Sequence, residues 1–346
     1  MNKKIVLGIE TSCDDTSIAI IEKTDELKVL SLISYDQEAS LKKWGGVVPE
    51  VAARNHLTKL PSLLDESFKN LEYTINDVDL IGVTVTPGLL GPLLTGLNCA
   101  KSLSLVYKKP ILPVNHLYAH LEAIHIDQNI SYPYLGLLVS GGHSIYFWVE
   151  SKSSFVVLGS TIDDAAGEAF DKGANLLGLG YPGGQNIDKK AKLGNKDRFE
   201  FPIGLKSSAD CRLSFSGLKT ALRVFLDKNK FAPDSQDFYD LCASYQEAIV
   251  KALSLKLRYA IKKVKEEFNT KDFQIVVGGG VACNSALRET LQQKYNDVYF
   301  VSPKYCTDNG AMIANYALIN QDDALSYPKS LELDARGRFI NKKDYL

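Results

Sequence analysis

Four of the five histidines, His116, His120, His125 and His143, fall within 28 positions of one another. His116 and His120 are four residues apart in a segment typical of a helix, so their rings would share one face with Cβ atoms about 5–6 Å apart, a spacing that suits two ligands of one metal. The segment 116–120 reads HLYAH and lacks the glutamate of the H-E-x-x-H metallopeptidases. By itself the pair predicts either a metal site or a packed or surface histidine pair.

A third ligand would have to come from far along the chain, and Asp308 is the candidate. It lies just before a predicted helix over residues 311–319, so it is also a candidate helix N-cap. Two histidines and one carboxylate with open coordination positions suit Fe(II), and Zn(II) less decisively.

Three glycine-rich segments follow apolar runs or lie in predicted loops: Ser140-Gly141-Gly142, Gly278-Gly279-Gly280 and Tyr181-Pro182-Gly183-Gly184. Their backbone N–H groups could cradle phosphate or carboxylate oxygens, because no side chain blocks the approach. Glycine turns are common in proteins, so each of these segments could be an ordinary turn. Two of them in a duplicated fold are equally consistent with a nucleotide-binding site.

An acidic group completes the candidates. Asp164, Glu168 and Asp171 have i, i+4, i+7 spacing and would share one helical face. That face could bind ribose hydroxyls or could simply be solvated.

Two strand–turn–strand passages must position these residues. Residues 5–10 and 16–21 flank a polar turn, and residues 134–139 and 144–149 flank the Ser140–His143 turn. The repetition predicts a duplicated α/β unit, although coincidence is the alternative. A third apolar run, 273–277, precedes the Gly278–Gly280 segment and a helical pattern from Asn284 to Leu291.

Helical patterns cover residues 55–68, one or two helices within 238–268, and residues 311–319. Residues 80–100 carry no charge over a length that could cross a bilayer, but the prolines and glycines inside them predict a strand, a loop and a helix instead.

The chain has 346 residues, enough for about two domains. Forty basic and forty-one acidic residues give a net charge of −1, which favours a small-molecule substrate. Residues 189–228 nevertheless hold ten basic and four acidic residues, and residues 251–265 hold six basic and none acidic. Both stretches are therefore candidates for binding nucleic-acid phosphates.

Six scattered cysteines without a C-x-x-C pair, and no apparent signal peptide, predict a cytoplasmic protein.

These segments together resemble the bacterial tRNA N6-adenosine threonylcarbamoyltransferases, the TsaD or Kae/Gcp-type family, from residue 5 to about residue 320. The resemblance rests on residues 8–16 (GIETSCDDT), His116 and His120, 139–143 (VSGGH), 167–172 (GEAFDK), 181–184 (YPGG), 214–220 (SFSGLKT), 278–284 (GGGVACN) and 307–312 (TDNGAM).

The resemblance implies a duplicated ribonuclease-H-like fold of the actin, sugar-kinase and heat-shock ATPase superfamily, with two lobes around a substrate cleft. We expect residues 1–125 and 309–346 in the first lobe, and residues 126–308 in the second, with a basic insertion at 189–228.

The resemblance also implies the site residues. His116, His120 and Asp308 would hold one Fe(2+) per subunit, with Zn(2+) as the alternative. Threonylcarbamoyl-AMP would contact Leu138, Val139, Ser140, Gly141, Gly142, Asp171, Gly184, Asp188 and Asn284.

The implied reaction transfers the threonylcarbamoyl group to N6 of the adenosine just 3′ of the anticodon, in tRNAs that read codons beginning with A, and releases AMP. An aromatic amine is a poor nucleophile, so loss of its proton matters, and Glu10 and His143 are the residues hypothesised to handle that proton.

The implied partners are tRNA and the proteins TsaB and TsaE, with TsaC or a relative making the adenylate and no membrane involved. Residues 55–68 are a candidate partner-binding helix. A kinase or ATPase of the same superfamily, a metallopeptidase of the O-sialoglycoprotein endopeptidase type and a non-catalytic scaffold are the alternatives.

Overall fold

The computed structural model describes residues 3–37 and 47–338. Contacts divide the chain into two compact units, Met1–Asn129 with Thr307–Leu346, and Ile130–Cys306. The predicted lobe boundaries lay at 125/126 and 308/309. Those boundaries put Asp308 in the second lobe, whereas the observed units put it in the first, together with both histidines of its proposed site.

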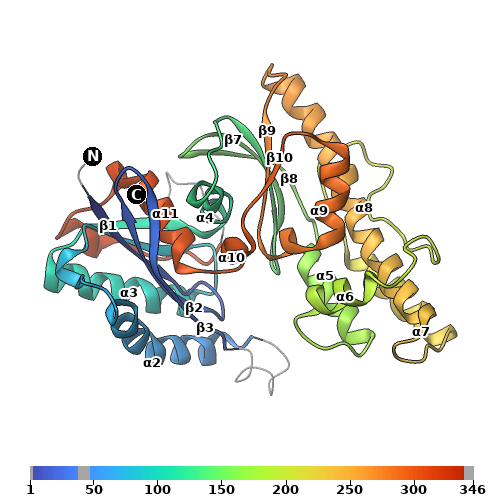
Figure 1. The fold of residues 1–346 in the computed structure, drawn as a ribbon, viewed down its shortest axis with the longest axis horizontal. Coiled ribbons are helices and arrows are strands. Elements are labelled where there is room, and N and C mark those ends of the chain that lie inside the picture. Colours follow the sequence, from blue (N-terminus) through green and yellow to red (C-terminus); the bar gives the residue numbers. More distant parts are fainter. Residues whose placement is uncertain (1–2, 38–46, 339–346) are drawn as a thin grey trace. The chain divides into compact units, whose positions relative to one another are not determined.

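The first unit contains a five-stranded sheet in the order β3-β2-β1-β4-β5. Its strands β1, β2 and β3 are labelled in Figure 1. β1 pairs antiparallel with β2, which pairs antiparallel with β3, whereas β1 pairs parallel with β4 and β4 with β5. The strands are β1 (Lys4–Glu10), β2 (Thr16–Lys23), β3 (Leu27–Tyr35), β4 (Leu80–Thr86) and β5 (Ile111–Asn115).

Alternation along β1 divides its side chains between two helical layers. Ile5, Leu7 and Ile9 pack into the core that contains leucines of α2 (Pro49–Phe68) and α3 (Leu90–Tyr107). Gly8 faces the other way, where a Cβ would lie 2.1 Å from the carbonyl oxygen of Gly310 in α11 (Gly310–Ile319). The absent side chain lets α11 contact the sheet.

The second unit repeats this arrangement. Its sheet has the order β10-β9-β6-β7-β8, with β6, β7 and β8 antiparallel and β6, β9 and β10 parallel. The strands are β6 (Tyr134–Val139), β7 (Ser144–Ser151), β8 (Ser154–Ser160), β9 (Gln274–Gly278) and β10 (Val298–Phe300). Both sheets thus start with a hairpin and continue with parallel strands, which confirms the predicted duplication.

The other elements are mostly short helices. The first unit also has α4 (His116–Glu122) and the 3-10 turns η2 (Ile75–Asp77), η3 (Ala123–Ile126), η5 (Gln321–Asp323) and η6 (Lys329–Glu332). The second has α5 (Ala166–Leu176), α6 (Gly183–Ala191), α7 (Ser216–Lys228), α8 (Gln236–Glu267), η4 (Gly280–Cys283), α9 (Ser285–Lys294) and α10 (Pro303–Cys306).

Most of the predicted helices are present with altered ends. α2 begins at Pro49, six residues before the predicted start at Asn55, since a proline is tolerated in the first turn of a helix. The pattern over 238–268 forms the single helix α8. The uncharged run 80–100 forms β4 and most of α3, and no helix among the described residues is long and apolar enough to span a membrane.

Candidate metal centre and glycine turns

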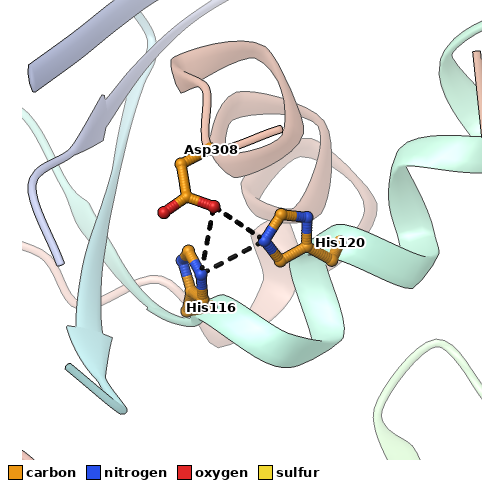
Figure 2. A group of neighbouring side chains, drawn as sticks. All are labelled: His116, His120 and Asp308. Atoms are coloured by element: carbon orange, nitrogen blue, oxygen red, sulfur yellow. Dashed lines mark hydrogen bonds and ion pairs between the residues drawn. The ribbon is translucent and has the colours of Figure 1, made fainter. Parts of the chain in front are cut away.

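The two histidines of the candidate metal centre lie on α4, directly after β5. Asn115 ends β5 and caps α4, because its side-chain oxygen accepts hydrogen bonds from the backbone N–H groups of Leu117 (3.0 Å) and Tyr118 (3.4 Å). The helix therefore starts at His116, and one turn later His120 lies on the same face (Figure 2). Both rings are almost completely buried.

Asp308 reaches the histidines because another residue caps α11. Asn309, and not Asp308, is the N-cap, since its side-chain oxygen accepts from the backbone N–H of Met312 at 2.9 Å. The alternative that Asp308 caps this helix is wrong. Its carboxylate points at the histidine pair instead (Figure 2).

The three ligand atoms are spaced as ligands of one ion would be. Oδ1 of Asp308 lies 3.0 Å from Nε2 of His120 and 3.5 Å from Nε2 of His116, and the two Nε2 atoms are 3.2 Å apart. Ligand atoms about 2.1 Å from one ion, at angles between octahedral and tetrahedral, are separated by about 3.0–3.4 Å. These residues therefore fit a divalent cation.

The charges around the site also favour a cation. Burial lowers the pKa of His116, but the carboxylates of Glu10 and Asp308 outweigh burial and raise it to about 9. Burial, followed by the charge on His116, lowers the pKa of His120. Without a metal, one proton on His116 at neutral pH supplies the positive charge that a divalent ion would otherwise supply.

Glu10 contacts His116 at Nδ1, the ring nitrogen that does not face Asp308 and His120. Its side chain is completely buried, and its Oε2 lies 3.0 Å from Nδ1 of His116 and accepts a hydrogen bond from the Thr84 hydroxyl at 2.6 Å. Its Oε1 accepts from the backbone N–H of Ser12 at 2.5 Å. The sequence did not single out Ser12 or Thr84 as partners of Glu10. Their positions were the available signal, since Ser12 follows the apolar run 5–9 and Thr84 lies in the apolar run that begins at Leu80.

The first glycine turn, Ser140–His143, lies in the second unit. It is closed by a hydrogen bond from the Ser140 N–H to the His143 carbonyl at 2.8 Å, and the His143 N–H donates to the Ser140 hydroxyl at 3.2 Å. Gly141 and Gly142 are exposed, and a Cβ on either would meet no atom within 4 Å. The turn therefore leaves room for a ligand to approach its backbone.

The turn after β9 is built differently. Gly279 has φ +89°, and a Cβ there would lie 2.4 Å from the carbonyl oxygen of Val139. Packing against β6 thus requires this glycine, so its presence is explained without a ligand.

The remaining predicted substrate contacts also lie in the second unit. The Leu138 and Val139 side chains are fully buried within β6, so only their backbone could touch a ligand. Asp171 accepts from the N–H of Gly183 at 2.9 Å, which ties α5 to the start of α6. Of the acidic face, Asp164 and Glu168 both form ion pairs with Lys172, at 2.8 and 2.7 Å.

Two further polar residues are joined to neighbouring helices. Asp188 on α6 accepts from the hydroxyl of Ser285 at 2.8 Å. Asn284 caps α9 through the N–H of Leu287 at 3.0 Å, and its amide donates to Gln246 at 2.7 Å. Side chains that were predicted to bind substrate thus join α6 to the start of α9, and the start of α9 to α8.

The fold defines the class of the protein. It resembles component A of the (R)-2-hydroxyglutaryl-CoA dehydratase of Acidaminococcus fermentans, with a TM-score of 0.53 at 16% identity, over 91% of this chain and 99% of that one. It also resembles full-length HypF in its phosphate- and nucleotide-bound form, with a TM-score of 0.55 at 15% identity, over 92% of this chain and 46% of HypF. The protein has the duplicated, actin-like fold.

Sequence comparison identifies the family within that class. Residues 28–315 match the family model of TsaD, tRNA N6-adenosine threonylcarbamoyltransferase. The chain is 45% identical over 337 residues to the enzyme of that name from Clostridium beijerinckii, covering 94% of this chain and 96% of the relative. It is 46% identical over 315 residues to the one from Thermosipho africanus, covering 90% and 92%. The chain belongs to the tRNA N6-adenosine threonylcarbamoyltransferase family.

Proposed function

We propose that this protein transfers the threonylcarbamoyl group from threonylcarbamoyl-AMP to N6 of the adenosine 3′-adjacent to the anticodon in tRNAs that read codons beginning with A. Family membership over nearly the whole chain carries this conclusion. The amine nitrogen forms a bond to the carbamoyl carbon, the bond from that carbon to the phosphate oxygen breaks, and the amine proton and AMP leave.

His116, His120 and Asp308 would hold one Fe(2+), with Zn(2+) as the alternative. A bound cation of this kind polarises and orients substrate oxygens and stabilises the negative charge that develops on them. The support is the mixed nitrogen and oxygen donor set and its 3.0–3.5 Å ligand separations.

The residues of the second unit would bind the adenylate. Gly141 and Gly142 are exposed and a Cβ on either would meet no atom within 4 Å, so their backbone N–H groups would be suited to phosphate oxygens. Asp171 on α5, Gly184 and Asp188 on α6, and Asn284 at the start of α9 would contact the ribose and adenine, and the backbone of Leu138, Val139 and Ser140 would complete the site.

His143 remains our proposal for the group that takes the amine proton. Its ring is half-buried at the end of the glycine turn, next to the groups proposed to bind phosphate. A His143→Ala variant that transfers at the wild-type rate in a single turnover would remove it from that role.

The proposed macromolecular partners are tRNA, TsaB and TsaE, with no membrane. Residues 55–68, within α2, stay our proposed partner-binding helix, on which Leu57 is 69% exposed. We also propose a cytoplasmic location, where the tRNA substrate is found.

The metallopeptidase and ATPase alternatives are not favoured. The helix has Leu117 where a zincin has its catalytic glutamate, and two of the three candidate ligands are histidines, whereas nucleotide-bound magnesium prefers oxygen ligands.

The test is mass spectrometry of tRNA nucleosides after incubation of the protein with its partners, threonylcarbamoyl-AMP and an unmodified tRNA that reads codons beginning with A. We expect threonylcarbamoyladenosine with the wild type and at least about a hundredfold less with His120→Asn, since loss of one ligand removes the cation. No modified nucleoside in any combination would refute the function.

A further inference from the structure

The Nδ1 atom of His116, on the far side of the ring from the three-ligand group, lies in a buried hydrogen-bond network. Oε2 of Glu10 is 3.0 Å away and the hydroxyl oxygen of Ser12 is 3.2 Å away. Glu10 in turn accepts from the backbone N–H of Ser12 and from the hydroxyl of Thr84. Every one of these groups is buried.

The parallel strands bring this network together. Glu10 is the last residue of β1, Thr84 lies near the end of β4, and His116 follows the end of β5. These three strands are neighbours, and Ile9 pairs with Val83, so Glu10 and Thr84 are side by side. The carboxyl ends of adjacent parallel strands meet at one sheet edge, so the network follows from the register.

The contacts of Glu10 determine the direction of its bond to His116. Both the Ser12 N–H and the Thr84 hydroxyl donate to Glu10, as expected around a carboxylate that only accepts. Nδ1 of His116 must therefore carry a proton and donate it. In the neutral ring, Nε2 then has the lone pair, and that atom faces Asp308 and His120.

We propose that Glu10 is a positioning residue that holds His116 in the Nδ1–H tautomer, with the Nε2 lone pair directed at the metal. As to its use in catalysis, this inference rests on the proposed function. His120 has no comparable anchor, because its Nδ1 is buried without a hydrogen-bond partner among the described residues. Glu10 therefore holds the proton on Nδ1 and fixes the orientation of the ring, so that Nε2 is the nitrogen that releases its proton when a metal binds.

This role differs from the proton-handling role that the sequence suggested for Glu10. A residue that takes a proton from the substrate must reach it, whereas the carboxylate of Glu10 is enclosed and both of its oxygens accept hydrogen bonds from the protein. The two roles predict different behaviour when the carboxylate becomes an amide.

Glu10→Gln tests the proposal because the shape is kept and a donor replaces an acceptor. The Ser12 N–H requires the amide oxygen at the Oε1 position, so the amide NH2 group faces Thr84 and His116. Nδ1 of His116 then has to accept, and the ring proton moves to Nε2, where it opposes metal binding. We expect metal affinity to fall about 10–100-fold.

Two readouts apply. Two-bond proton–nitrogen correlation spectra of the metal-free protein, recorded at alkaline pH where the His116 ring is neutral, report its tautomer. Calorimetric titration with Zn(2+), and with Fe(2+) under anaerobic conditions, reports affinity. Thr84→Val is the matched control, since it removes a hydrogen bond to the same Glu10 oxygen but leaves His116 its acceptor. We expect it to keep the Nδ1–H tautomer and an affinity within about threefold of wild type.

The proposal is supported if the wild type has Nδ1–H, Glu10→Gln has Nε2–H, and the variant binds metal at least tenfold more weakly. It is overturned if the wild type has Nε2–H, or if Glu10→Gln binds metal like the wild type. If Glu10→Gln binds metal like the wild type but no longer transfers the threonylcarbamoyl group, the proton-handling role of Glu10 is restored. If the wild type has the Nδ1–H tautomer but binds neither Zn(2+) nor Fe(2+), the proposed metal centre is refuted, whereas the positioning of His116 by Glu10 is still supported. If Glu10→Gln does not fold, the wild-type tautomer alone decides.

Discussion

The chemistry of a side chain in this protein depends on which hydrogen bonds it already makes. Asn309 satisfies the first turn of α11, so the carboxylate of Asp308 next to it is available to the histidines. Asn284 uses its amide oxygen to cap α9 and donates one N–H to Gln246, so of its amide the second N–H is the donor for the proposed adenylate. Residue type alone does not distinguish these two situations, because capping and ligand binding use the same polar atoms.

Cys283 offers a pH-dependent prediction at this scale. A hydrogen bond from Cys306 lowers the pKa of Cys283 to about 7 against the effect of burial, with help from Arg288. The other five thiols have raised pKa values, in every case with burial among the causes. Cys283 should therefore react first with iodoacetamide, at a rate that rises about tenfold per pH unit below pH 7 and levels off above it.

Peptide mass spectrometry of timed, quenched samples would measure this rate. Cys306→Ser should change the midpoint, because the serine hydroxyl is a different donor, whereas Cys99→Ser should leave the Cys283 profile unchanged. A rate that keeps rising to pH 9 would show that Cys283 has an ordinary thiol pKa.

At the scale of elements, the metal centre depends on close contact between β1 and α11. Gly8→Ala would place a Cβ 2.1 Å from the Gly310 carbonyl oxygen and 2.6 Å from the Ala314 nitrogen, both backbone atoms. We expect a loss of about 2–3 kcal/mol in the free energy of unfolding. Weaker Zn(2+) binding should accompany it, because Asp308 lies just before the displaced helix.

Urea denaturation and calorimetric metal titration would measure both effects. Gly217→Ala, in the first turn of α7, is the matched control, since a Cβ there meets nothing within 4 Å and alanine favours a helix. Equal stability of Gly8→Ala and wild type would mean that α11 does not pack on β1 as described.

Asp163 secures the start of α7 from a distance in sequence. Its carboxylate accepts from the hydroxyl of Ser214 (2.5 Å), the N–H of Phe215 (2.7 Å) and the hydroxyl of Ser216 (2.8 Å). Burial raises its pKa, but these hydrogen bonds outweigh burial and lower it from 3.8.

A carboxyl whose pKa is lowered by folding stabilises the protein above its unfolded pKa, and this contribution disappears as pH falls through the folded pKa. Asp163→Asn should therefore cost about 1 kcal/mol of unfolding free energy at pH 7 and less at pH 3, because the contribution begins to disappear below the ordinary pKa of 3.8. Urea titrations at both pH values would measure this, with Asp272→Asn as an exposed control of equal charge change. A cost that is the same at both pH values would exclude the ionised carboxylate as its source.

At the scale of the whole molecule, a net charge near zero conceals an uneven distribution. The stretch 189–228 carries ten basic and four acidic residues. Not all of the basic residues of the two stretches are available, however. Lys256 is 1% exposed and donates to the Ser208 carbonyl and hydroxyl, and Lys190 pairs with Asp234. Lys256 is thus removed from the predicted phosphate-binding set.

Lys219 and Arg223 remain as neighbours on α7, four residues apart, beside the buried Leu218 and Leu222. We expect the double variant Lys219→Glu with Arg223→Glu to bind tRNA more weakly and to lower the salt dependence of binding by about 1.5 in log–log slope, roughly 0.7–0.9 per lost phosphate contact.

Filter binding across a salt series would measure this slope. Lys28→Glu with Lys69→Glu, exposed in the first unit, makes the same charge change and serves as the control. An unchanged slope for the α7 variant would move the tRNA-binding surface to other residues or to the partner proteins.

The sequence by itself determined the local and repeated features of this protein. The i, i+4 spacing of His116 and His120 placed both rings on one helical face, and two apolar hairpins predicted two equivalent sheets. Such features depend on residues close in sequence, whose relative positions follow from helix and strand geometry. The motifs shared with the family supplied Asp308 as the third ligand, which spacing alone could not select.

Only the tertiary structure decided how distant residues share their bonds. It assigned the cap of α11 to Asn309, brought Ser12 and Thr84 to Glu10, and buried Lys256. The bond from Thr84 to Glu10 and those from Lys256 to Ser208 join segments tens of residues apart, so they depend on strand register or on helix packing. A buried polar atom must find a partner, and which partner it finds depends on the register, which the type of the residue does not specify.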